Sequence, residues 1–187
     1  MCSILKILQA TELPAFYSFL FMIFRMSTQS KVMLDTNVYD KIALKDEQLI
    51  PEIISSQKIT VYGCRVIREE LRAIPKGEKV GSRNLRVMLL RTCDLLVKKH
   101  DLPVEDIAEY VAKEYTAEYS GNKPKKDLYS DFLIVAVASL KDLDIVCTDD
   151  SKTMSSTDTV EAYKKVNERN GLRTPQFIPY ASFKKLV

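Results

Sequence analysis

Acidic residues directly follow two short apolar segments of the chain. Asp35 comes after residues 32–34 (VML), and Asp149 and Asp150 come after residues 145–148 (IVCT). Segments this short and apolar are typical of buried strands, and in open α/β sheets ligands bind at the carboxyl ends of the strands. An Asp at the end of a strand is also a common helix N-cap or turn residue, so each position taken alone has two interpretations.

Glu70 lies on the apolar side of an expected helix. At about 100° per residue, Glu70 falls between Val66 and Ile74, whereas Glu69 falls on the charged face. An ionised carboxylate that faces a core is costly unless it pairs with a cation or binds a metal. The alternative to a metal site is a salt bridge between Glu70 and an Arg elsewhere in the chain.

Asp131 opens a helix that is almost entirely apolar, with the sequence DFLIVAVASL. It shares a face of that helix with Val135 and Ala138, so we expect its side chain to point inward. The alternative is an Asp in the first turn that the helix dipole stabilises. Asp127 precedes Asp131 by one turn and either joins the same face or lies in the loop.

Together these acids predict a pocket of carboxylates that binds a divalent cation. Four carboxylates in one pocket repel one another at pH 7 unless a cation lies among them. Because no histidine accompanies them, the oxygen ligands favour Mg²⁺ or Mn²⁺ over zinc. Carboxylate-bound divalent ions hydrolyse phosphodiester bonds by ionising a water and neutralising the leaving oxygen. The pattern therefore indicates nuclease chemistry without a protein nucleophile.

Strands and helices alternate along the chain and must position these acids. Apolar runs predict strands over residues 31–35, 58–63, 144–148 and 176–178. Helical periodicity predicts helices over residues 36–44, 47–56, 65–74, 82–99, 103–119, 131–142 and 158–171. The expected N-caps include Ser82, Asp101 or Leu102, and Asp158 in a D-x-x-E start with Glu161. Strands separated by helices imply an α/β fold with a small parallel sheet flanked by helices on both faces.

The same residues resemble a known family. The segments VMLDTNVYD, VIREEL and SDFLIVAVASLKDLDIVCTDD resemble the PIN-domain ribonucleases, most closely the VapC type of toxin–antitoxin systems. The Asp-Thr-Asn opening matches at residues 35–37, the Glu-Leu pair at 70–71, the helix-opening Asp at 131 and the Thr-x-Asp at 148–150. The resemblance covers about residues 31–155, and its four motifs occur in the family's order.

This resemblance implies a PIN-like three-layer sandwich over residues 27–187 and a Mg²⁺- or Mn²⁺-dependent endoribonuclease. It implies an RNA substrate, a toxin role with a cognate antitoxin protein, and a homodimer. The catalytic acids around the metal would be Asp35, Glu70, Asp131 and Asp150, with Asp149 as the alternative fourth ligand. Asn37 and Thr148 would orient these ligands without binding the metal. The helical tail after about residue 155 departs from the toxin pattern, and the PIN fold also serves ribosomal RNA processing and RNA decay.

Composition excludes several other classes of protein. The chain has 187 residues, 46% hydrophobic and 28% charged, which is ordinary for a globular protein of one domain. Its net charge of +3 permits a nucleic-acid partner without requiring one. Four dispersed cysteines and the single His100 leave almost no ligands for a zinc site. Cys64 and Cys147 lie in apolar runs and are expected to be buried thiols, which suits a cytoplasmic protein.

The first 26 residues differ from the rest because residues 16–24 (FYSFLFMIF) carry no charge. This run is shorter than the ~20 residues of a membrane-spanning helix, so we expect no stable membrane association. The segment is a short hydrophobic anchor, a helix packed on the domain, or an over-extended gene start whose true first residue is Met26.

Basic residues give weaker support for a nucleic-acid partner. Arg83, Arg86 and Arg91 lie on the expected long helix, which ends at Lys98, Lys99 and His100. Lys123, Lys125 and Lys126 precede Asp131 in a basic loop over residues 121–126, where they could hold phosphates. Solvated charged faces are the alternative interpretation of both groups. Tyr129 could stack on a base but does not identify a site.

Two other functions remain open at this point. A PIN-like module without turnover would bind RNA or a protein, although four mutually repelling acids then have no purpose. A phosphatase with Asp35 as its nucleophile usually needs a second Asp two residues later, and position 37 is Asn.

Overall fold

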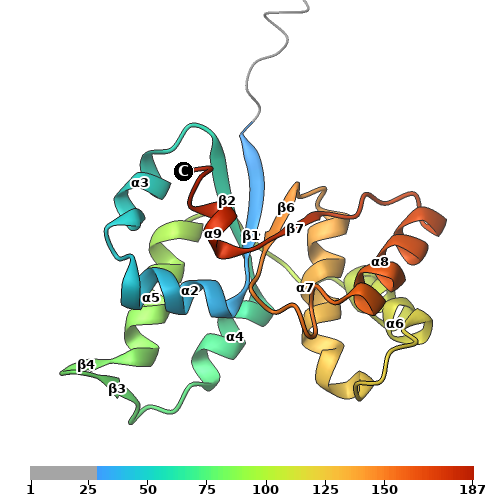
Figure 1. Cartoon of the computed structure of the whole chain (residues 1–187), viewed down its shortest axis with the longest axis horizontal. Helices are drawn as coiled ribbons and strands as arrows, with labels where there is room; N and C mark the ends of the chain where they lie inside the picture. Colours follow the sequence, from blue (N-terminus) through green and yellow to red (C-terminus); the bar gives the residue numbers. More distant parts are fainter. Residues whose placement is uncertain (1–28) are drawn as a thin grey trace, which may run out of the picture.

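A parallel sheet of five strands runs through the computed structural model, which describes residues 29–187 (Figure 1). The strand order is β5-β2-β1-β6-β7, and every neighbouring pair is parallel. The strands are β1 (Ser30–Leu34), β2 (Ile59–Cys64), β5 (Asp101–Leu102), β6 (Ile145–Cys147) and β7 (Gln176–Ile178). The apolar residues Val32, Met33 and Leu34 of the central strand β1 are fully buried. Consecutive buried residues are expected of a strand that is covered on both faces.

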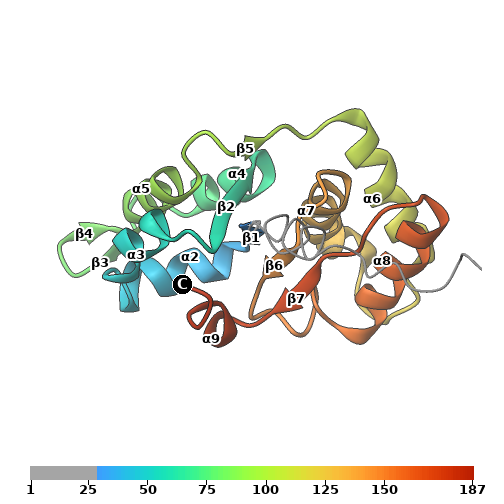
Figure 2. The same cartoon turned by 90° about the horizontal axis from the view of Figure 1, so that it is seen from above.

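Two groups of helices enclose the sheet, so the architecture is a three-layer α/β/α sandwich (Figures 1 and 2). One group consists of α2 (Thr36–Lys45), α3 (Leu49–Ser55), α4 (Arg65–Ala73) and α5 (Leu85–Val97). The other consists of α6 (Asp106–Glu118), α7 (Tyr129–Leu140) and α8 (Thr157–Arg169). The two groups meet where α4 contacts α7.

Three short elements complete the described part of the chain. The 3₁₀ helix η1 (Lys125–Leu128) leads into α7, and α9 (Tyr180–Phe183) follows β7. A small antiparallel hairpin of β3 (Lys79–Val80) and β4 (Arg83–Asn84) lies before α5. The strands predicted at residues 31–35, 58–63, 144–148 and 176–178 are confirmed to within two residues at their ends.

Several helix starts differ from the prediction. Ser82 is not an N-cap, because Gly81 adopts a positive φ of 61° and turns the chain into the β3–β4 hairpin. The α5 cap is Asn84, whose side chain accepts from the Val87 N–H at 3.0 Å. Neither Asp101 nor Leu102 caps α6, because both pair with β2 as strand β5.

The N-cap of α6 was predicted too early in the chain, and the N-cap of α8 was predicted two residues too late. The N-cap of α6 is Glu105, after the extended segment that Pro103 favours. The N-cap of α8 is Ser156, whose hydroxyl accepts from the Thr159 N–H at 3.4 Å, so Asp158 lies in the first turn instead of capping it.

Cys64 and Cys147 are buried free thiols, as expected. Among residues 29–187, no helix combines the length and the apolar character that crossing a membrane requires. The predicted extension over residues 1–26 and the first two residues of the predicted 27–187 domain lie outside the described residues.

Candidate active site

Asp35 and Thr148 lie side by side because of the register between β1 and β6. Leu34 pairs with Cys147, so the next residue of each strand emerges at the same edge of the sheet. The Asp35 N–H donates to the Cys147 carbonyl at 2.9 Å, and the Thr148 hydroxyl donates to Asp35 Oδ2 at 2.7 Å. The carboxylate is therefore held from β6 at a position where it is only 6% exposed.

Asp35 is both a helix cap and a member of the acidic group. Its Oδ1 accepts from the Thr36 N–H at 2.7 Å and caps α2, while Asn37 Nδ2 donates to Oδ2 beside Thr148. Burial raises the pKa of Asp35, the hydrogen bonds from Thr148 and Thr36 oppose this rise, and the charge of Asp150 adds to it. The helix-cap interpretation of this Asp is thus confirmed for Oδ1, and its role as a ligand stays a prediction.

Glu70 extends from α4 toward the same edge of the sheet. It is half-buried, whereas Glu69 is exposed and pairs with Arg65 at 3.2 Å, so the predicted helical phase is confirmed. The Thr36 hydroxyl donates to Glu70 Oε2. Burial raises the pKa of Glu70, and the charge of Asp35 raises it further against the opposing Thr36 hydrogen bond.

The salt bridge considered for Glu70 does not form with any residue of 29–187. Within residues 29–187, no Lys or Arg lies within salt-bridge distance of this carboxylate. Glu70 is therefore a half-buried acid without a countercharge in the described part of the chain.

Asp131 shows the strongest effect of its surroundings. It lies in the first turn of α7, and burial raises its pKa to about 7, against a lowering hydrogen bond from Thr153. The charges of Asp35, Asp150 and Glu70 contribute to this rise, in that order. Four carboxylates from β1, α4, α7 and the end of β6 thus share one electrostatic environment. Asp127 does not join them, because it is exposed within η1.

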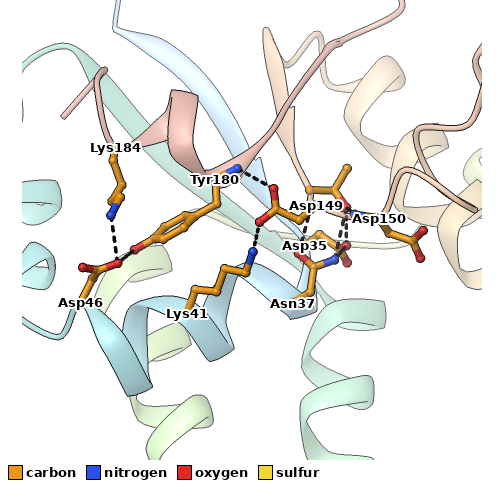
Figure 3. A network of polar contacts seen from close by, with 9 residues as sticks. Asp35, Asn37, Lys41, Asp46, Asp149, Asp150, Tyr180 and Lys184 are labelled. Carbon is orange, nitrogen blue, oxygen red and sulfur yellow. Dashed lines mark hydrogen bonds and ion pairs between the residues drawn. The ribbon is translucent and has the colours of Figure 1, made fainter.

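Asp149 and Asp150 turn to opposite sides of the chain (Figure 3). The Asp149 carboxylate forms an ion pair with Lys41 and accepts from the Tyr180 N–H at 2.9 Å. Burial raises the pKa of Asp149, but the hydrogen bonds from Lys41 and Tyr180 and the charge of Lys41 together outweigh it, so the pKa is lowered. Asp149 thus belongs to a charge-paired network that ties α2 to α9.

Asp150 organises the turn that follows β6. Its Oδ1 accepts from the N–H groups of Lys152 and Thr153, each at 2.8 Å, and the Thr153 hydroxyl donates to Oδ2. Burial raises the pKa of Asp150, yet these hydrogen bonds outweigh it, so the pKa is lowered. The charge of Asp150 raises the pKa values of Asp35 and Asp131. The charge of Asp149 is instead paired with Lys41. The acidic group therefore comprises Asp35, Glu70, Asp131 and Asp150.

The donor set of the acidic group suits a hard divalent cation. Carboxylate and hydroxyl oxygens from Asp35, Glu70, Asp131 and Asp150 with their Thr neighbours are the ligand types that Mg²⁺ and Mn²⁺ prefer. Among the described residues, no three His, Cys, Asp or Glu side chains stand close enough to form a ready-made metal cluster. Instead, hydroxyl and amide donors occupy oxygens of Asp35, Glu70 and Asp150.

Three lysines lie in the segment before α7, and one of them, Lys123, is near Asp150. Lys123, Lys125 and Lys126 are exposed and have no salt-bridge partner in the described part of the chain. The charge of Lys123 contributes to the lowered pKa of Asp150, so this lysine lies near one of the acids.

The predicted basic face of α5 is a different surface. Arg83 pairs with Glu47 at 3.1 Å, and Arg91 lines a groove of about 540 Å³ between α3 and α5. None of the four acids lines this groove. The solvated-face interpretation therefore fits α5 better than a role beside the acids.

Sequence patterns did not identify several residues that hold the acidic group. Thr36 donates to Glu70, Thr153 donates to Asp150, and Lys41 pairs with Asp149. The only local signal was Thr153, three residues after Asp150, which is the spacing of an Asx turn. The other two contacts join distant segments and depend on the fold.

Two solved structures of other proteins resemble the described part of the chain. The structure of FitAB bound to an IR36 DNA fragment matches at a TM-score of 0.51 and 16% identity, over 80% of this chain and 94% of that chain. The crystal structure of VapBC2 from Rickettsia felis, bound to a DNA fragment from their promoter, matches at a TM-score of 0.46 and 12% identity, over 80% and 98%. No protein-family model and no curated protein matches the chain. The likeness to FitAB shows that the chain has the predicted PIN-like α/β/α fold.

Proposed function

We propose that this chain is a metal-dependent endoribonuclease that hydrolyses RNA with Asp35, Glu70, Asp131 and Asp150, as the toxin of a toxin–antitoxin pair. The observation that carries this proposal is the grouping of these four carboxylates without a salt bridge to any Lys or Arg of residues 29–187. Burial and the neighbouring carboxylates accordingly raise the pKa of Asp131 to about 7. Neighbouring acids disfavour one another's ionised form, because their negative charges repel. A divalent cation among them would stabilise the ionised form and is their natural counterion. The PIN-like fold and the sequence motifs agree with this function.

Three of the four acids in this proposal have neighbours that hold them in place by hydrogen bonds. Asn37 and Thr148 hold Asp35, Thr36 holds Glu70, and the Thr153 backbone and hydroxyl hold Asp150. When bound, Mg²⁺ or Mn²⁺ would ionise a water and neutralise the leaving 3′ oxygen of the cleaved strand.

The lysines beside the acids support a polyanionic substrate. Lys123, Lys125 and Lys126 would hold backbone phosphates of the RNA and so place a phosphodiester bond at the acids. This binding depends on salt, because each neutralised phosphate releases counterions. The substrate thus meets positive charge from the loop and negative charge from the acids in one small region.

A metal titration with end-labelled single-stranded RNA tests the function. We expect no cleavage in EDTA, restored cleavage with Mg²⁺ or Mn²⁺, and no cleavage by a folded Asp35→Asn variant. Binding of RNA without cleavage under all conditions would support the silent binding module instead. Hydrolysis of a small phosphate monoester with the RNA left intact would support the phosphatase.

A protein partner is part of this proposal. Side chains on α3 and α5 remain exposed although they are apolar, with Ile54 40%, Val87 60% and Leu95 39% exposed. Apolar surface of this kind beside polar residues such as Glu47 and Arg83 is typical of protein interaction sites. An antitoxin or a second copy of the chain would cover it. Light scattering distinguishes a homodimer from an antitoxin complex. It would be measured on the purified chain alone and after co-expression in the cytoplasm with the small protein of an adjacent reading frame.

A further inference from the structure

Tyr163 carries a buried hydroxyl that has no partner among the described residues. The residue is fully buried in α8, and its hydroxyl oxygen makes no hydrogen bond to residues 29–187. Buried polar groups are nearly always satisfied, so an exception needs a reason. Tyr163 also lies beyond residue 155, outside the segment that carries the sequence motifs.

The ring of Tyr163 is held tightly by other aromatic residues. It stacks on Phe177 with centroids 5.6 Å apart, and meets Phe132 edge-on at 5.9 Å and Tyr115 edge-on at 4.9 Å. Phe132 is the residue next to Asp131. Because these contacts fix the ring, any hydrogen bond of its hydroxyl requires the acceptor side chain to turn toward it.

Tyr163 shares a face of α8 with Thr159, four residues earlier, and this face packs against the turn that holds Asp150. Thr159, one turn earlier on α8, donates to the Thr153 carbonyl at 2.7 Å, and Thr153 in turn holds Asp150. Burial raises the pKa of Tyr163, and the charge of Asp131 is the next cause. The geometric evidence is the edge-on contact between the Tyr163 ring and Phe132, because Phe132 follows Asp131 in the first turn of α7.

We propose that Tyr163 is a positioning residue that donates a hydrogen bond to Asp131 when the acidic group holds its metal. This inference rests on the proposed function. A ligating carboxylate uses one oxygen for the metal, and a hydrogen bond to the other oxygen commonly fixes its orientation. Tyr163 is the buried donor in α8 that remains free for this task.

Tyr115 provides a matched control. Its hydroxyl is also buried in the same aromatic cluster, but it donates to Asn167 Oδ1 at 2.6 Å and lies 3.3 Å from the Ser139 hydroxyl. Removing the Tyr115 hydroxyl breaks a satisfied network, whereas removing the Tyr163 hydroxyl deletes an unsatisfied group. The two Tyr→Phe variants should therefore change the stability of the metal-free protein in opposite directions.

The test measures metal-free Tm and Mn²⁺ affinity, the latter from the free Mn²⁺ signal in electron paramagnetic resonance. We expect Tyr163→Phe to raise the metal-free Tm by about 2–5 °C and to weaken Mn²⁺ binding by about tenfold or more. Tyr115→Phe should lower the Tm and leave Mn²⁺ affinity unchanged. RNA cleavage by Tyr163→Phe should recover at saturating Mn²⁺, as expected of a positioning residue.

Wild-type Mn²⁺ affinity in Tyr163→Phe would overturn the role of Tyr163 while leaving the proposed function intact. A Tm lowered as in Tyr115→Phe would show that the hydroxyl serves the fold and would also overturn it. If the wild-type protein binds no Mn²⁺, the proposed function fails, and the role of Tyr163 fails with it.

Discussion

Asp149 and Asp150 are adjacent in the chain, yet their carboxylates belong to separate networks (Figure 3). Successive side chains of an extended segment point to opposite sides, and this alternation continues past the end of β6. Asp149 therefore pairs with Lys41 and accepts from the Tyr180 N–H. Asp150 accepts from the Thr153 hydroxyl, and its charge raises the pKa of Asp35. One acid of the pair is neutralised by a cation of the protein, and the other belongs to the acidic group.

Exchanging each of these acids for its amide should separate the two roles. We expect Asp150→Asn to lower metal-dependent RNA cleavage by at least about 100-fold, the scale for loss of one preorganised electrostatic group. Asp149→Asn should lower cleavage only a few fold and should destabilise the fold by about 1 kcal/mol, because the Lys41 ion pair is partly exposed. Initial cleavage rates and urea unfolding measure the two effects. The reverse ranking of the cleavage rates would assign the fourth acid to Asp149.

Glu69 and Glu70 form a second pair of neighbours with different surroundings. Glu70→Gln should lower cleavage by about 100-fold or more, because this half-buried acid faces the group that Thr36 helps to hold. Glu69→Gln should be nearly silent, because an exposed pair with Arg65 contributes about 0–1 kcal/mol. The comparison needs only rates at a fixed Mg²⁺ concentration. Equal losses in both variants would show that the inward position of Glu70 has no catalytic meaning.

Local patterns were sufficient to predict four of the five strands of the sheet and the inward-facing acids, but not the two-residue strand β5. Short apolar runs predicted β1 and β6 because central parallel strands are buried on both faces. Helical phase separated Glu70 from Glu69, since a 3.6-residue period assigns side chains to faces without any tertiary information. Those two signals are local, and the positions of Asp35 and Glu70 follow from them.

Contacts between distant segments could not be predicted in the same way. The pairing of Lys41 with Asp149 depends on how α2 lies beside the end of β6, and the burial of Tyr163 depends on how α8 packs. Ser82 was predicted as a cap because the β3–β4 hairpin has only two residues in each strand, too short for a periodic signal. Short elements and long-range ion pairs are therefore the features that required the structure.

The segment before Met26 is expected to be dispensable. A protein that starts at Met26 should fold, stay in solution and cleave RNA at the rate of the full chain. The reason is that β1 begins at Ser30 and its register with β2 starts at Ser30 and Ile59. Removing residues 16–24 also removes a long uncharged aromatic run that promotes association. Gel filtration, Tm and cleavage rates compare the two forms.

Two results would contradict this expectation. Aggregation of the shorter form beside a monomeric full chain would show that the segment packs on the domain. Sedimentation of the full chain with lipid vesicles, lost in the shorter form, would show that the segment is an anchor.

Asp131 should make the metal-free protein less stable as the pH rises. Its pKa in the folded chain is about 7, above the ordinary value of 3.8, so the folded chain holds a proton that the unfolded chain has released. The stabilisation from this proton is fully present below pH 3.8 and is lost as the pH rises through 7. In EDTA, the free energy of unfolding should fall by about 2 kcal/mol more between pH 5.5 and 8 than in Asp131→Asn. Asp127→Asn, which changes an exposed acid nearby, should keep the wild-type pH dependence. Parallel curves for wild type and Asp131→Asn in urea unfolding would show that the acids do not share one environment.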